Sequence, residues 1–460
     1  MGKEDSMASR SPVQTTPQLS RRAFLGRTGG TVAAAALAGV GGPLAACSPP
    51  TEGGAGTTAL DFVIWNYNVE TVQSNIDKFQ QKYPDIAVRL LDFSWNAYHE
   101  TMVNRFNSTT PTDVAYDGGN WLPEFAKAGW VVPLSDHFDW AAGYRDKTYE
   151  FAWQDMSYGG KVYGLPYYAD TISFLYNEKI LSDAGIGNPP QTWEELTDQA
   201  KRLQRDGMER PLIIEVAQDL PTITEVFTSM VFGRGGDMFD ENGQPLWTDA
   251  SSAVAQQLEW LVNAATVDKI LTHVPHETDV VRAMNTGRHA FTVLYNYNLA
   301  ALNNKATSSR AGQYKLALMP GETHECYGFA KFYNMTKMAV DRGDEVVDAC
   351  GTFIEYFAGE TDGAYVVAKR WALDSGLGFG QKPLFDDPEV RSSLGQWMDL
   401  DLREEQLRLA RAQRHTVWYG IWDEFFRREY VKALAGETDA ADALGAAATR
   451  WNELRDQYGG

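Results

Sequence analysis

Residues 158–181 read YGGKVYGLPYYADTISFLYNEKIL, and the other elements of the fold are arranged about this segment. Gly159-Gly160 predicts a hairpin turn, because glycine adopts positive φ angles freely. Lys161 to Leu165 predicts a short strand that ends at Pro166, which lacks the N–H that a strand ladder needs. Ile172 to Tyr176 is an apolar run and predicts a second, buried strand.

Between these two strands, the sequence predicts an irregular connector that carries Tyr167, Tyr168 and Asp170. Flat rings beside a carboxylate suit a polyhydroxylated ligand, because its C–H faces pack on rings and its hydroxyl groups need acceptors. A loop that packs its rings on the core would have the same composition. The connector is therefore either a sugar-binding surface or a core loop.

The first 46 residues predict a targeting segment rather than part of the fold. Arg21-Arg22 begins a twin-arginine pattern, and a weakly apolar run rich in Ala and Gly follows. The run ends in LAAC at 44–47, which resembles the lipobox of bacterial lipoproteins, in which the cysteine is acylated. We therefore expect a lipid anchor at Cys47, with residues 47–58 as a flexible tether.

Composition limits the partners of the chain. Its 460 residues include 41 Lys and Arg against 61 Asp and Glu, a formal net charge of −20. Such a surface repels nucleic acid and anionic lipid head groups, so we expect no nucleic-acid partner. It is compatible with a cationic ligand such as a polyamine, and equally with an acidic, well-solvated exported protein. The length predicts more than one domain.

The sequence predicts neither a metal site nor a cofactor. His273 and His276 are the only closely spaced histidines, and they lack the partners of a defined metal site. Cys326 and Cys350 remain after the anchor cysteine, and they either pair outside the cytoplasm or stay buried as free thiols.

Strands and helices alternate regularly after residue 59, which predicts an α/β fold built on mainly parallel sheets. Ligands of such folds bind at the carboxyl ends of strands. Four side chains at or just beyond these ends are candidate ligand contacts: Trp65, Asn68, Asp117 and Trp121. Tyr297 follows a later predicted strand in the same way.

The last part of the chain predicts helices. Asp399 to Gln413 is highly charged and predicts an exposed segment, and Trp418 begins a long helix. The rings of Trp418, Tyr419 and Trp422 cannot all face inward at helical spacing. At least one of them therefore faces a cleft or packs partly buried against a neighbouring helix.

No catalytic motif is present. The chain has no GxSxG elbow, no Walker A loop and no HExxH helix. Acid pairs are abundant, so a surface-tethered glycoside-active enzyme stays an alternative.

Seven short motifs together resemble extracellular solute-binding protein family 1, the carbohydrate-type receptors of ABC importers. They occur in order along the mature chain: PTDV at 111–114, AKAGWVVPL at 126–134, GGKVYGLP at 159–166, YNEK at 176–179, PQTWEEL at 190–196, GRHA at 287–290, and GET at 436–438 with AL at 443–444. The resemblance implies two α/β lobes around a ligand cleft, joined by crossover strands. It assigns residues 59–168 and 334–384 to lobe I, and residues 169–333 and 385–460 to lobe II.

The resemblance also implies site residues. In the maltose-binding branch a carboxylate four residues after the equivalent proline contacts sugar hydroxyls, and Asp170 holds that place. Trp418 and Tyr419 fall where that branch has stacking rings, Tyr297 falls where it has a tryptophan, and Asp117 and Trp121 lie in a contact loop. The basic contact that the branch has after its first strand is not evident at 68–70.

The function implied is a monomeric sugar-binding lipoprotein on the outer face of the cell membrane. It would close on a sugar and deliver it to a permease whose separate ATPase subunit hydrolyses ATP, with no covalent chemistry of its own. A polyamine or other small-solute receptor of the same fold is the first alternative, and the tethered glycoside-active enzyme is the second.

Overall fold

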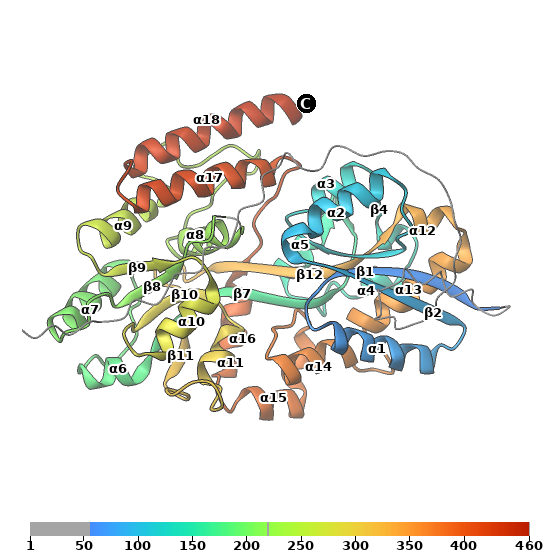
Figure 1. Cartoon of the computed structure of the whole chain (residues 1–460), viewed down its shortest axis with the longest axis horizontal. Coiled ribbons are helices and arrows are strands. Elements are labelled where there is room, and N and C mark those ends of the chain that lie inside the picture. The colour runs from blue at the N-terminus through green and yellow to red at the C-terminus, as the bar shows by residue number, and fades with distance from the viewer. Residues whose placement is uncertain (1–55, 219, 460) are drawn as a thin grey trace, which may run out of the picture. The chain divides into compact units, whose positions relative to one another are not determined.

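The structure is a computed structural model that describes residues 56–218 and 220–459 (Figure 1). The predicted targeting segment, Cys47 and most of the predicted tether lie outside these residues. The described part is a mixed α/β fold whose main sheet has the order β2-β1-β3-β12-β7-β10-β8-β9, with β4, β11 and β13 pairing beside this path. The two-lobed α/β architecture expected from the sequence is confirmed.

One half of the sheet comes from the N-terminal part of the described chain. It alternates β1 (Thr58–Trp65), α1 (Val69–Lys82), β2 (Ile86–Phe93), α2 (Trp95–Asn107) and β3 (Val114–Gly118). β1 pairs in parallel with both β2 and β3, so the carboxyl ends of these strands lie at one edge. Strand–helix alternation with apolar strands therefore gave the parallel sheet that it predicts.

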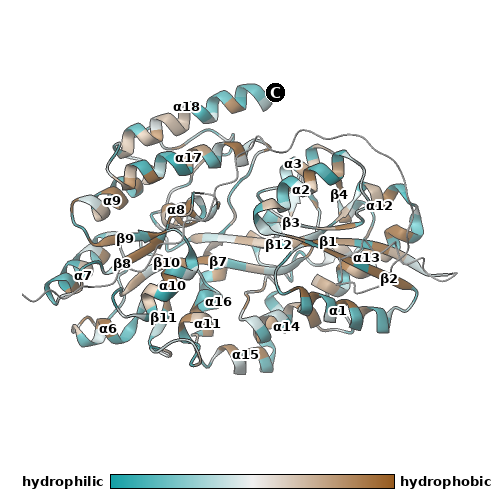
Figure 2. Ribbon diagram, in the orientation of Figure 1, coloured by the Kyte–Doolittle hydropathy of each residue, from teal (hydrophilic) through white to brown (hydrophobic). Residues whose placement is uncertain are grey.

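The other half contains β8 (Leu212–Glu215), β9 (Leu271–Val274), β10 (Phe291–Tyr295) and β11 (Tyr314–Ala317). β8 is parallel to β9 and β10, whereas β10 and β11 run antiparallel to β7. Figure 2 shows that β1 and β8 are largely hydrophobic, as strands covered on both faces by helices must be.

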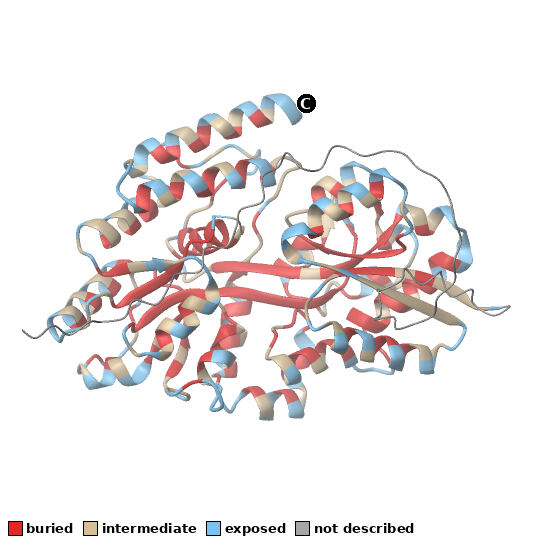
Figure 3. Cartoon of the chain, viewed as in Figure 1, coloured by how far each residue is buried: buried red, intermediate tan, exposed pale blue. Residues whose placement is uncertain are grey.

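Two long strands connect the halves: β7 (Pro166–Asn177) and β12 (Cys326–Thr336), which pair antiparallel. Nearly every residue of both strands is buried (Figure 3). A third connection is the stretch between α14 (Val366–Ser375), which contacts α13 (Asp344–Ala358), and α16 (Leu400–Leu409), which contacts β7, β11 and β12; β13 (Ala410–Arg411) then pairs with β12 and leads to α17 (Tyr419–Leu434). Three chain segments thus pass between the lobes.

The shorter elements and remaining helices cover the sheet. In chain order they are α3 (Leu122–Lys127), β4 (Val131–Val132), η1 (Leu134–Asp136), α4 (Trp140–Gly143), α5 (Glu150–Asp155), β5 (Ser157–Tyr158), β6 (Lys161–Val162), α6 (Glu178–Asp183), α7 (Trp193–Arg205), α8 (Thr222–Gly233), α9 (Ala253–Thr266), α10 (Glu277–Asn285), α11 (Asn298–Asn303), α12 (Lys337–Asp341), α13 (Asp344–Ala358), α14 (Val366–Ser375), η2 (Lys382–Asp386), α15 (Pro388–Leu394), α16 (Leu400–Leu409) and α18 (Ala440–Tyr458). α17 and α18 lie side by side (Figure 1). The ring of Trp422 on α17 packs edge-on against that of Trp451 on α18.

The strand that begins at Lys161 ends before Pro166, as predicted, but the predicted irregular connector at 166–170 is wrong. β7 is one continuous strand, and the expected irregular connector forms its first half. Pro166 is the first residue of the strand, where its missing N–H costs nothing, and the pairing with β12 shifts register beside it. The glycine hairpin is confirmed, because β5 and β6 pair across Gly159-Gly160.

The predicted exposure of the segment 399–413 is also wrong in part. It forms α16 and β13, and its side chains at Arg403 and Gln406 are buried. Cys326 and Cys350 are both free and buried, which resolves the two possibilities left open for them.

Within the described ranges, no helix combines the length and apolarity that a bilayer crossing requires. The same residues hold no cluster of three His, Cys, Asp or Glu side chains placed to bind a metal ion.

Candidate functional site

A cavity of about 430 Å³ opens where strand ends of both halves meet. Nine aromatic side chains line it, and we call it the aromatic cavity: Trp65, Tyr67, Trp95, Tyr116, Tyr167, Tyr168, Tyr295, Tyr297 and Phe329. Its polar lining includes the carboxylates of Glu215, Glu225 and Glu277 and the ammonium of Lys331. Rings with a few convergent polar groups are the usual make-up of a small-ligand site.

The topology explains why these rings meet. Trp65 is the last residue of β1, and Trp95 is the first residue of α2, so both lie at the carboxyl edge of the parallel strands. Tyr295 ends β10 on the other half, and Tyr167 and Tyr168 lie on the connecting strand β7. Residues far apart in sequence therefore reach one cavity through the strand order.

Trp65 anchors the ring cluster on the β1 side. Its ring stacks on Tyr67 with centroids 5.0 Å apart and an interplanar angle of 15°, and it meets Trp95 edge-on at 5.0 Å. Such contacts hold each ring in one orientation. The β1 side of the cavity is therefore a preformed apolar wall.

The opposite side is hydroxylic and acidic. Tyr297 donates a hydrogen bond of 2.6 Å to Oε2 of Glu277, and Tyr295 donates to Oε2 of Glu225. The two tyrosine rings stack at 5.5 Å with an interplanar angle of 10°. Burial raises the pKa of both Glu277 and Glu225, and the tyrosine hydrogen bonds oppose that rise. These acceptors suit ligand hydroxyl or amino groups.

Lys331 brings positive charge to the Glu225 side of the cavity. It lies on β12 opposite Gly118 of β3, and its ammonium opposes the rise in the pKa of Glu225, Asp117 and Asp155. This one cation therefore faces several carboxylates.

The structure places Asp170 behind the cavity wall. Asp170 is fully buried, its Oδ1 accepts from the Thr171 amide at 2.8 Å, and it forms an ion pair with Arg403. Tyr168 Oη lies 3.4 Å from its Oδ2. Asp170 does not line the aromatic cavity, whereas Tyr168 does.

Four other predicted residues lie outside the aromatic cavity. Asp117 is fully buried and accepts from the Gly118 amide at 2.7 Å, and burial raises its pKa well above the usual range. Asn68 is exposed, holds the left-handed conformation with φ 45°, and donates to Ser375 at 3.3 Å. Trp121 and Tyr419 line a second cavity of about 500 Å³, which shares Trp95 with the aromatic cavity.

Trp418 is not among the lining residues of either cavity. Its ring packs edge-on against Trp451 of α18 with centroids 5.6 Å apart. The structure thus brings Trp65, Tyr167, Tyr168 and Tyr297 together in the aromatic cavity. Trp121 and Tyr419 line the second cavity, and Trp418 packs against α18 instead.

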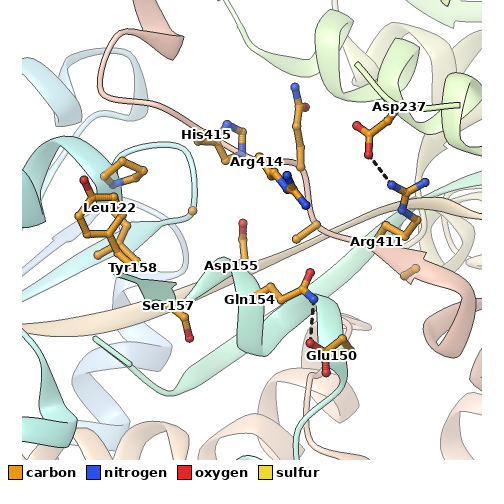
Figure 4. A pocket seen from close by; sticks show the side chains of 15 residues that line it. Leu122, Glu150, Gln154, Asp155, Ser157, Tyr158, Asp237, Arg411, Arg414 and His415 are labelled. Carbon is orange, nitrogen blue, oxygen red and sulfur yellow. Dashed lines mark hydrogen bonds and ion pairs between the residues drawn. The ribbon is translucent and has the colours of Figure 1, made fainter. Parts of the chain in front are cut away.

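A third cavity, of about 560 Å³, lies beside β13 and the residues that follow it, and is drawn in Figure 4. Asp155 of α5 points into it, and Arg411 on its far side pairs with Asp237. The Ala330 amide of β12 donates to Oδ2 of Asp155 at 2.8 Å, and burial raises the pKa of Asp155 to about 7.

Several cavity residues were not predicted from the sequence: Tyr67, Trp95, Glu225, Glu277 and Lys331. Trp95 and Tyr67 follow strand ends, so the strand-end rule that found Trp65 could have found them. Glu277 and Lys331 carry no local signal, because charged side chains at helix starts and on strands most often face solvent and bind nothing.

Comparisons with known proteins identify the family of the chain. A family model described as bacterial extracellular solute-binding protein matches residues 65–324, more than half of the chain. The chain is 24% identical over 226 residues to the diacetylchitobiose binding protein DasA of Streptomyces coelicolor, which is 46% of this chain and 50% of that protein. It is 25% identical over 265 residues to an arabinooligosaccharide-binding protein of Bacillus subtilis, 55% of this chain and 58% of that one.

The chain spans about half the length of the curated relatives it matches, from 31% to 58%. Among solved structures it is similar to maltose-bound MalE3 of T. maritima, with a TM-score of 0.74, 18% identity, and coverage of 86% of this chain and 100% of that chain. At that identity the likeness shows the fold.

Proposed function

Because the chain belongs to the bacterial extracellular solute-binding protein family, we propose that it is the sugar receptor of an ABC importer. It captures a sugar or oligosaccharide between two lobes and delivers it to a membrane permease. The observation that carries the proposal is the aromatic cavity, in which nine rings and three carboxylates converge from both halves of the sheet. Sugars present C–H faces to rings and hydroxyl groups to carboxylates.

The proposed contacts are the predicted residues that line the cleft, together with those added by the structure. Trp65, Tyr67 and Trp95 supply stacking surfaces from the β1 side. Tyr297 and Glu277 supply hydroxyl and carboxylate partners from the other side. Trp121 and Tyr419 extend the contact surface into the second cavity if the ligand is longer than one ring.

We divide the lobes as the family resemblance implies, at residues 59–168 with 334–384 and residues 169–333 with 385–460. On this division the chain crosses between the lobes at 168–169, 333–334 and 384–385, and we expect backbone angles to change near these crossings when the lobes close. A ligand that touches both walls binds the closed state better than the open one, and that difference in affinity drives closure.

We further propose that twin-arginine export and acylation at Cys47 hold the receptor, as a monomer, on the outer face of the membrane. A single acyl chain binds a membrane only reversibly, so more than one chain is needed for stable anchoring. The receptor itself does no covalent chemistry, because ATP is hydrolysed by a separate subunit.

A thermal-shift screen with a panel of mono- and oligosaccharides tests the proposal. A sugar present at a hundred times its Kd should stabilise the protein by about 2.7 kcal/mol. Calorimetry should then give one site per chain, and the sugar should be recovered chemically unchanged. Hydrolysis of the sugar would favour the glycoside-active alternative, and the absence of binding across the panel would overturn the proposal.

A further inference from the structure

We propose that the aromatic cavity selects a sugar that carries a protonated amine, with Glu277 as the partner of the ammonium group. This inference rests on the proposed function and narrows its substrate class. It starts from the asymmetry of the cavity, which is apolar on the β1 side and acidic on the α10 side. An alkylammonium group between rings and a carboxylate gains both cation–π and charge attraction.

Glu277 has one oxygen ready for such a ligand. Tyr297 at 2.6 Å and Asn298 at 3.4 Å both donate to Oε2. Across the described ranges, no hydrogen-bond donor reaches Oε1 and no Lys or Arg forms an ion pair with Glu277. Glu277 is also the first residue of α10, where the helix dipole favours a carboxylate over a carboxylic acid.

Aromatic rings from both halves of the sheet line the same cavity as this carboxylate. Burial raises the pKa of Tyr67, which follows β1, and of Tyr168 on β7, and the charge of Glu277 adds to both rises. Burial raises the pKa of Tyr297 well above its usual value, and the charges of Glu277 and Glu215 add to that rise. Tyr67, Tyr168 and Tyr297 thus line one cavity with this carboxylate, where a cation gains both from aromatic faces and from an anionic partner.

The other charged groups of the cavity do not cancel this preference. Lys331 acts on Glu225, Asp117 and Asp155, so its ammonium already faces an excess of negative charge. Arg403 is paired with Asp170 behind the wall. His276 lines the cavity beside Glu277 and is the remaining titratable group on that side besides Glu215.

The burial that raises the pKa of Glu277 gives a second readout. A bound ammonium favours the ionised carboxylate and lowers that pKa again, so binding at mildly acidic pH should release protons. A neutral sugar offers no charge that would do this. Calorimetry in two buffers with different ionisation enthalpies measures the number of protons released.

The decisive experiment compares sugars in pairs that differ only in an amino or hydroxyl group. Glucosamine is compared with glucose, galactosamine with galactose, and chitobiose with cellobiose, with N,N′-diacetylchitobiose as the uncharged acetamide. Spermidine tests whether an alkylammonium without a sugar suffices. We expect at least one aminated sugar to bind about tenfold tighter than its neutral and acetylated counterparts and tighter than spermidine, with proton release that grows as the pH is lowered toward the pKa of Glu277.

Two glutamate variants test whether the preference for an aminated sugar depends on Glu277. Glu277→Gln should reduce the ratio of aminated to neutral affinity to about one, whereas Glu241→Gln, at an exposed position outside the cavity, should keep the ratio of the unaltered protein. Equal or tighter binding of the neutral or acetylated sugar overturns the inference and leaves the sugar receptor intact. Tightest binding of spermidine overturns both, and the same follows if no sugar of any kind binds.

Discussion

Arg403 and Asp170 form an ion pair in which both side chains are almost completely buried, at 4% and 0% exposure. Arg403 lies on α16, and Asp170 lies on β7, the first connection between the lobes. Gln406 extends the network, because its Oε1 accepts from Arg403 at 2.7 Å and from Thr171 at 3.0 Å. The carboxylate that the family resemblance assigns to sugar contact here fastens a connecting strand to a helix.

Replacing Arg403 should therefore destabilise the fold. Arg403→Met leaves the carboxylate of Asp170 buried without its cation, and such losses typically cost about 3–5 kcal/mol. Urea unfolding followed by circular dichroism measures the free energy of unfolding. The double variant Arg403→Met with Asp170→Asn should recover part of the loss, because it removes the buried charge.

Arg408 is the matched control on the same helix. Its side chain is 61% exposed and pairs with Glu404 one turn away. Arg408→Met should change the free energy of unfolding by less than about 0.5 kcal/mol. Equal losses of unfolding free energy at both positions would mean that the buried ion pair stabilises the fold no more than the exposed pair does.

Removing a ring from the apolar wall should weaken ligand binding. Trp95→Ala removes a lining side chain of both the aromatic and the second cavity, and we expect a loss of about 10- to 100-fold in affinity for the tightest sugar of the panel. Trp140, which stacks on Phe138 at 5.1 Å outside these cavities, is the control. Calorimetry should give unchanged affinity for Trp140→Ala, and a comparable loss there would argue against the cavity.

Asp155 should make the protein more stable at mildly acidic pH than at neutral pH. Burial raises its pKa from 3.8 to about 7 in the folded state, so between these values the folded chain binds a proton that the unfolded chain has released. The contribution of Asp155 to stability then falls as pH rises from about 4 to 7, by at most ~4 kcal/mol.

Melting temperatures between pH 4.5 and 7.5 test this sign. Asp155→Asn should flatten the decline, because the amide does not titrate. Asp456→Asn, at a side chain with 77% exposure, should leave the profile unchanged. A profile for Asp155→Asn that is parallel to that of the unaltered protein would show that Asp155 does not carry the effect.

If Cys47 carries the proposed lipid anchor, replacing it should release the protein from the membrane. Cys47→Ser removes the sulfur that would be acylated, so the protein should move from the membrane fraction to the soluble fraction. Incorporation of labelled palmitate should be lost at the same time. Continued labelling of Cys47→Ser would place the acyl chain elsewhere.

The fold could be predicted because its signals are local. Alternating strand and helix patterns from residue 59 onward are properties of neighbouring residues, and the structure has β1, β2 and β3 in parallel as they indicate. Residues 166–170 were wrongly predicted to be irregular, because a proline can either end a strand or begin one. Pairing with β12, which is far away in sequence, decided between these.

The candidate site could be predicted only in part. Trp65, Tyr167, Tyr168 and Tyr297 were found because strand ends and an aromatic connector can be recognised locally, and the structure places all of them on one cavity. Asp170 shows the limit, because no local pattern reveals that an arginine more than two hundred residues later pairs with its carboxylate.

Composition and short-range periodicity were enough to establish the α/β class, the order of the elements and the acidic character of the chain. Which carboxylates face the cavity depended instead on packing. Glu277 lies beside Tyr297 and Asp170 lies beside Arg403 because of strand order and helix packing, which join residues without regard to their separation along the chain. The environment of a charge is a property of everything packed around it, so only the folded chain could settle it.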